Sequence, residues 1–105
     1  MAPRRTQTVL VSTQDRLGRL VVLTEDRWWG HIVDGHREME GLELAVLRAV
    51  ENADRTRPGK RPGRQELYAQ GLGPARWLAV VVDYSQEPAW VVTAHPMSKD
   101  PKIQP

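Results

Sequence analysis

Three histidines are the side chains of this sequence best suited to acid–base chemistry. His31 and His36 lie five residues apart, and His95 lies near the C-terminus. An imidazole changes its charge at roughly pH 6.5, so it can accept or donate a proton under physiological conditions. All three are therefore candidate catalytic residues, with an ordinary packing or surface role as the alternative for each.

A metal site is the competing interpretation, and the spacing disfavours it. Five residues rotate about 140° around a helix axis, so His31 and His36 would not share a helical face. The sequence contains no cysteine, which excludes thiolate ligands. If a turn at Gly35 brought His36 back toward His31, the remaining candidate ligands would be Asp34, Glu38 and His95. We expect neither a metal nor another cofactor.

A basic segment over residues 54–64 is the next candidate. Its proline and glycine residues predict an exposed loop, and it carries five cations: Arg55, Arg57, Lys60, Arg61 and Arg64. Such a loop can bind the phosphates of a nucleic acid, or it can be a solvated connector. Arg64 differs from the others because it stands immediately before a predicted strand that carries Tyr68, which gives its side chain a fixed direction.

The last predicted strand carries a polar pair. Thr93 and His95 alternate along it, so both side chains should point to one face of the sheet. Trp90, Val92 and Ala94 should point to the other face. A threonine and a histidine at the end of a strand can form part of a polar site, although an ordinary edge strand would look the same.

Alternating and periodic apolar residues predict the elements that must position these side chains. Thr24 is a candidate N-cap and Gly35 a candidate C-terminal stop for the first helix. The predicted order is a hairpin of strands 7–11 and 19–24, helices 25–34 and 38–53, and an antiparallel meander of strands 65–70, 76–84 and 89–95. Helices packed on an antiparallel sheet make this an α+β fold.

The length of 105 residues suits one domain. We expect a flexible arm over residues 1–6 and an irregular tail over residues 97–105. We identify no signal peptide and no apolar run long enough to cross a membrane, so we expect a cytoplasmic protein without a membrane partner.

Three segments together resemble a known superfamily. They are Trp-Trp-Gly-His-Ile-Val-Asp-Gly-His-Arg-Glu-Met at 28–39, Glu-Leu-Tyr at 66–68 and Val-Val-Thr-Ala-His at 91–95. With the basic loop between them, they resemble phage-type members of the barnase, EndoU, colicin and RelE-like superfamily, over about residues 19–96. The resemblance implies helices packed on an antiparallel sheet and a metal-independent ribonuclease, in many members a toxin.

The resemblance also implies roles for residues. His31 or His36 would carry one proton and His95 another, although this superfamily has an aromatic residue where His95 stands. Arg64 would neutralise charge at the phosphate, with Tyr68 and Thr93 as hydrogen-bond donors. The expected partners are RNA and an antitoxin or immunity protein. The alternatives are a non-catalytic module that binds RNA or protein and a structural protein of a mobile element.

Overall fold

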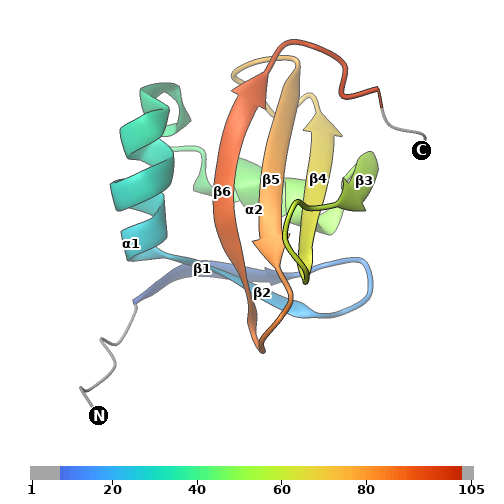
Figure 1. The fold of residues 1–105 in the computed structure, drawn as a ribbon. Helices are drawn as coiled ribbons and strands as arrows, with labels where there is room; N and C mark the ends of the chain where they lie inside the picture. Colours follow the sequence, from blue (N-terminus) through green and yellow to red (C-terminus); the bar gives the residue numbers. More distant parts are fainter. Residues whose placement is uncertain (1–7, 103–105) are drawn as a thin grey trace.

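Six strands form one mixed sheet in the computed structural model, which describes residues 8–102 (Figure 1). Their order across the sheet is β1-β2-β6-β5-β4-β3. The bounds are β1 (Val9–Gln14), β2 (Leu20–Thr24), β3 (Arg55–Pro58), β4 (Arg64–Gln70), β5 (Trp77–Asp83) and β6 (Ala89–Met97). The predicted arm over residues 1–6 lies outside the described residues.

The sheet corrects the predicted arrangement, although the chain is α+β. The N-terminal hairpin is not separate from the meander, because β2 pairs with β6 in parallel through Val21↔Ala89 and Val22↔Trp90. All other pairings are antiparallel. The parallel pairing has two residue pairs only, and such a short contact leaves no pattern in either strand.

The predicted basic loop over residues 54–64 is also corrected, because it contains strand β3. Arg55 pairs with Tyr68 and Arg57 with Glu66 across β3 and β4. β3 is an edge strand, and none of its four residues is buried. An edge strand needs no alternating apolar pattern, and cations are common on it. The sequence of β3 therefore has the composition of a loop, which is why a loop was predicted there.

The first helical segment begins where the sequence predicts it. α1 (Glu25–Arg27) follows Thr24, whose hydroxyl accepts the Arg27 amide at 3.3 Å. The segment continues as wider π-helical turns over Trp28–Val33, which bury Trp28 and Ile32. Gly35 stays helical and does not stop the segment, so the predicted glycine stop is wrong. The helical conformation ends at His36, with φ −143° and ψ 87°.

The predicted helix over residues 38–53 is wrong as one element. A 3₁₀ turn over Arg37–Met39 and helix α2 (Glu43–Glu51) take its place. Gly41 lies between them with φ +85°, a conformation that no α-helix contains. The apolar spacing runs through this break because Met39 and Val46 both reach the core, each with 0% exposure.

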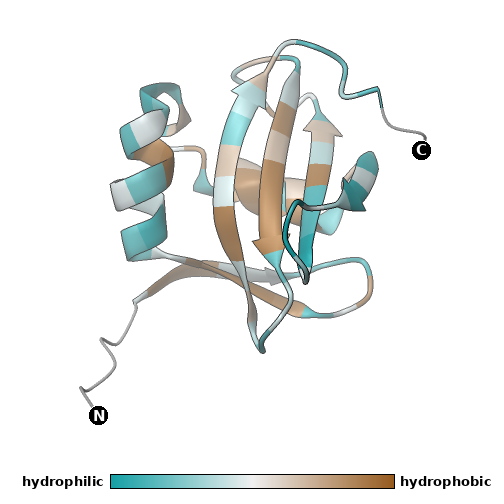
Figure 2. Cartoon of the chain, in the orientation of Figure 1, coloured by the Kyte–Doolittle hydropathy of each residue, from teal (hydrophilic) through white to brown (hydrophobic). Residues whose placement is uncertain are grey.

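The core lies on one side of the sheet. α2 lies behind β4, β5 and β6, and the helical segment beginning at α1 lies beside β6 (Figure 1). Leu78, Val80 and Val82 of β5 are buried in this core. Figure 2 shows that β5 is apolar and that the edge strand β3 is hydrophilic. The opposite side of β3–β6, which we call the outer face, is not covered by α2. No helix within residues 8–102 is long and apolar enough to span a membrane.

Candidate active site on the outer sheet face

The strand register brings distant polar residues into rows on the outer face. Residues opposite one another on antiparallel strands project to the same side. One row runs Arg55, Tyr68, Ala79 and His95 across β3 to β6. The neighbouring row runs Arg57, Glu66, Val81 and Thr93. The sheet therefore places His95 and Thr93 on the same face as Tyr68 and Glu66. The predicted placement of Trp90 on the other face is wrong, because a bulge between Val81 and Val82 pairs Trp90 with Asp83 and turns it to the outer face.

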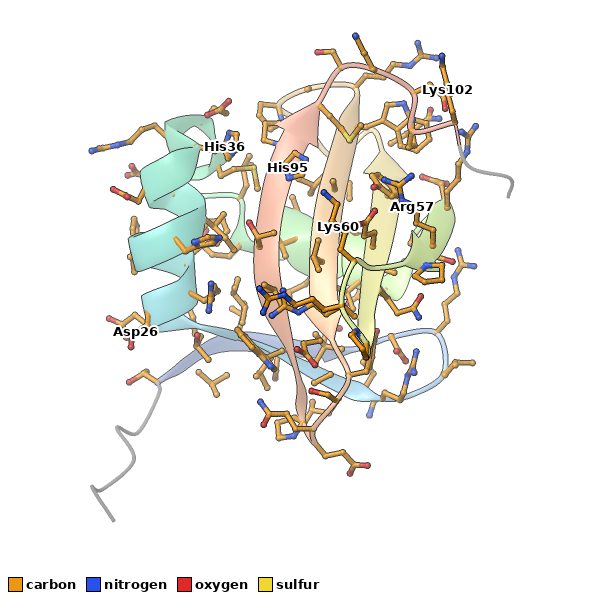
Figure 3. All side chains as sticks on the ribbon, viewed as in Figure 1. Asp26, His36, Arg57, Lys60, His95 and Lys102 are labelled. Carbon is orange, nitrogen blue, oxygen red and sulfur yellow. The ribbon has the colours of Figure 1, made fainter. Side chains whose placement is uncertain are left out.

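His36 lies against His95 at the border of the outer face. Their ring centroids are 5.8 Å apart and the ring planes differ by 25°, and Figure 3 shows His36 on the helical side facing His95 on β6. Burial lowers the pKa of His95, and the neighbouring His36 lowers it further when protonated. His95 is therefore neutral at pH 7, ready to accept a proton. His36 Nδ1 lies 4.0 Å from Glu38 Oε2.

Glu66 is the centre of a hydrogen-bond network beside the histidines. The Tyr68 hydroxyl donates to Glu66 Oε1 at 2.7 Å, and Arg57 Nε donates to the same oxygen at 2.5 Å. Burial opposes ionisation of Glu66, but these two hydrogen bonds outweigh it, so its pKa lies below the usual value. Tyr68 has a raised pKa because it is buried and bonded to this carboxylate. The Tyr68 hydroxyl is thus neutral, and it donates its proton to the Glu66 carboxylate.

Arg64 is fixed at the end of the outer face where β4 begins, which we call the lower end. Its Nε lies 3.3 Å from Asp83 Oδ2. Gly59 approaches it so closely that a Cβ on Gly59 would lie 2.8 Å from the Arg64 Cβ. Arg27 lies over the Trp90 ring, 4.9 Å from its centroid. Burial and the charge of Arg64 lower the pKa of Arg27, so α1 adds a second cation to this end.

The other predicted nucleic-acid-binding cations take different positions. Arg55 pairs with Asp100 at 2.5 Å and lies 5.0 Å from the Trp77 ring centroid. Lys60 lies close enough to Glu66 for its charge to lower the pKa of that carboxyl, and Figure 3 shows it in front of the sheet between His95 and Arg57. Arg61 is exposed, and its carbonyl accepts the Arg64 amide at 3.2 Å.

His31 is the predicted site residue that the structure keeps away from the others. It is exposed on the π-helical turn, and within residues 8–102 no aromatic or ion-pair contact of its ring is present. His36, five residues later, reaches His95 because the helix has ended there. In the same range, no group of three or more His, Asp or Glu side chains is arranged to hold a metal ion.

The prediction from sequence omitted Glu66, Asp83 and Arg27 from this site. Glu66 had a usable signal, because it alternates with Arg64 and Tyr68 on the predicted strand and must share their face. Asp83 lies at the end of an apolar run and reads as a strand terminus. Arg27 belongs to a helix whose side-by-side packing with β6 only the fold reveals.

The lowered pKa of His95 makes stability depend on pH. Between pH 6.5 or so and the lower folded pKa, the unfolded chain binds a proton at His95 and the folded chain does not. We therefore expect the free energy of unfolding to fall as the pH falls through this window. His95→Gln should flatten this part of the profile in urea titrations. An unchanged slope in the variant would show that His95 is not held neutral by the fold.

Comparison of the chain with protein-family models, curated proteins and solved structures found no match. The superfamily resemblance of residues 28–39, 66–68 and 91–95 therefore stays a prediction.

Proposed function

We propose that this protein is a metal-independent endoribonuclease that binds RNA on the outer sheet face. The observation that carries the proposal is the stacked pair of His36 and His95, which lies beside a network of cations and a carboxylate. Two histidines at one site supply a proton acceptor and a proton donor near neutral pH. RNA carries its own nucleophile, the 2′-hydroxyl, so the protein need only move protons and stabilise charge.

The chemistry assigns His95 as the base. Neutral His95 takes the proton of the 2′-hydroxyl, and the 2′-oxygen forms a bond to the adjacent phosphorus. The bond from phosphorus to the 5′-oxygen breaks. Protonated His36 gives its proton to that oxygen, and Glu38 Oε2 lies 4.0 Å from its Nδ1. The products are a 2′,3′-cyclic phosphate and a free 5′-hydroxyl.

The cations of the outer face stabilise the charge that develops on the phosphate. Lys60 extends over the face near Glu66, and Arg57 is oriented by its hydrogen bond to that carboxylate. Glu66 and Tyr68 act as positioning residues for Arg57 in this scheme. Arg64 and Arg27 lie at the lower end, where they can bind the phosphate backbone on one side of the cleaved bond.

A second candidate function, a non-catalytic module that holds RNA, is favoured by the aromatic rings on the same face. Arg27 contacts Trp90, and Arg57 lies 5.6 Å from the Tyr68 ring centroid. Single-stranded RNA is commonly bound by cations combined with aromatic side chains. This function requires no proton transfer, and it predicts RNA affinity that does not depend on the histidines.

The test is an RNA-cleavage assay with purified protein in the presence and absence of EDTA. We expect equal cleavage in both, with 2′,3′-cyclic phosphate ends, and no cleavage of RNA that carries 2′-O-methyl groups. Intact RNA together with salt-sensitive binding would favour the binding module. Intact RNA without binding would overturn both functions. The proposed compartment is the cytoplasm, and an antitoxin or immunity protein is the proposed protein partner.

A further inference from the structure

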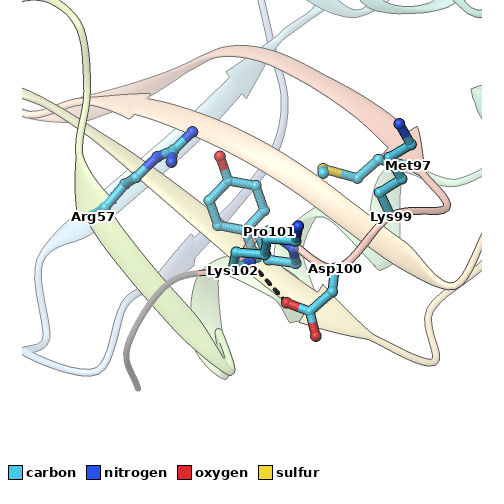
Figure 4. Close-up of a pocket in the computed structure, with 7 residues that line it drawn as sticks. Arg57, Met97, Lys99, Asp100, Pro101 and Lys102 are labelled. Atoms are coloured by element: carbon cyan, nitrogen blue, oxygen red, sulfur yellow. Dashed lines mark hydrogen bonds between the residues drawn. The ribbon is translucent and has the colours of Figure 1, made fainter.

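A depression lies beside Met97, where the chain leaves β6 and crosses the outer face. Its volume is about 590 Å³, within the range of about 300–1,000 Å³ that is usual for small-molecule sites. Tyr68 and Met97 line it from the sheet and Pro101 from the crossing segment (Figure 4). The depression is therefore formed by the fold of residues 98–102 over β4 and β6.

The charge of the depression is positive. Arg57, Lys99 and Lys102 line it, and both lysines are exposed. Within residues 8–102, neither lysine side chain forms an ion pair. One carboxylate, Asp100, also lines it: its Oδ1 pairs with Arg55 at 2.5 Å and accepts the Lys102 amide at 2.7 Å (Figure 4). Arg57 is already bonded to Glu66 at 2.5 Å, so Lys99 and Lys102 are the cations that an anionic ligand would meet first.

The sheet side of the depression is apolar. Met97 packs against the buried cluster of Tyr68, Trp77 and Ala79. A thioether beside a proline ring offers a surface on which a flat nucleobase can lie. Met97 follows His95 by two positions on β6, which places the two side chains roughly 7 Å apart on the same face. A ligand here would therefore continue directly from the histidine pair.

We propose that this depression binds one nucleotide of the RNA substrate, next to the phosphate that is cleaved. The base lies against Met97 and Pro101, and the phosphate on its far side lies between Lys99 and Lys102. This inference rests on the proposed ribonuclease function, and it names the part of the RNA that the crossing segment contacts. The ion pair of Asp100 and Arg55 holds that segment in place and does not itself contact the nucleotide.

The test measures binding of adenosine 3′,5′-bisphosphate to the whole protein by calorimetry. We expect Lys99→Ala and Lys102→Ala each to weaken binding by about 10-fold, as expected for loss of one partly exposed contact to a phosphate. Both side chains are exposed, so the variants should fold normally. Arg48→Ala is the matched control, because Arg48 lies on α2 with a side chain that is 68% exposed. It removes the same charge and should leave the affinity unchanged.

A parallel RNA-cleavage assay separates the two proposals. We expect the lysine variants to raise KM for RNA while kcat is retained. If wild-type protein cleaves RNA but the bisphosphate fails to bind, or binds the lysine variants equally well, the nucleotide site is overturned and the ribonuclease stands. If binding depends on the lysines but RNA stays intact, the ribonuclease is overturned, and with it the position next to a cleaved phosphate.

Discussion

His95→Ala is expected to lower the rate of RNA cleavage by about 10²- to 10⁴-fold, the usual contribution of a positioned acid or base. The side chain lies on the outer face, stacked against His36 at 5.8 Å, and its pKa is lowered by burial. No neighbouring group on β6 can replace it, because Thr93 and Met97 do not titrate near neutral pH. Single-turnover rates on a short RNA, measured at about pH 7, report the loss directly.

His31→Ala is the matched control for this prediction. It removes the same ring from an exposed position on the neighbouring helical turn, so cleavage should stay close to the wild-type rate. His36→Ala should lower the rate, and the double variant with His95→Ala should lose less than the product of the two losses, because the rings act together. Equal activity of the His31 and His95 variants would contradict the assignment. Urea titrations confirm that each variant is folded.

Trp28→Ala is expected to reduce the free energy of unfolding by about 3–5 kcal/mol, the usual cost of removing a large ring from a core. Trp28 has 0% exposure and lies in the main core cluster. Domains of this size are usually stable by about 5–15 kcal/mol, so the change removes a large part of the total. Urea denaturation followed by circular dichroism gives the difference.

Trp29→Ala is the control, because the adjacent ring is 47% exposed and its loss should cost about 1 kcal/mol or less. The comparison also reaches the site, since the same helical segment carries His36 to its position beside His95. Trp28→Leu keeps part of the volume and should be intermediate in stability and in cleavage. Equal losses at Trp28 and Trp29 would contradict the packing of this segment against β6.

Much of the local structure was readable from the sequence. The apolar run of β5, the hairpin of β1 and β2, and the N-cap at Thr24 each follow from short-range rules of side-chain alternation and capping. Alternation also placed Thr93 with His95 on a shared face, but it misplaced Trp90, because simple alternation does not foresee the bulge in the pairing of β5 with β6. The same rule of alternation puts Glu66 on the face of Tyr68, although the prediction did not include it.

Only the tertiary structure decided how these pieces combine. β2 pairs in parallel with β6, and β3 pairs with β4 as an edge strand. Each pairing depends on a contact that the residues of the strands themselves do not announce by any pattern. Gly41 interrupts the second predicted helix, which the apolar spacing alone would continue. Gly35 remains helical and does not end the first one. Above all, the sequence offered three equivalent histidines. Packing of the helical segment beside β6 brought His36 to His95 and left His31 exposed, because the position of a ring depends on where its element lies.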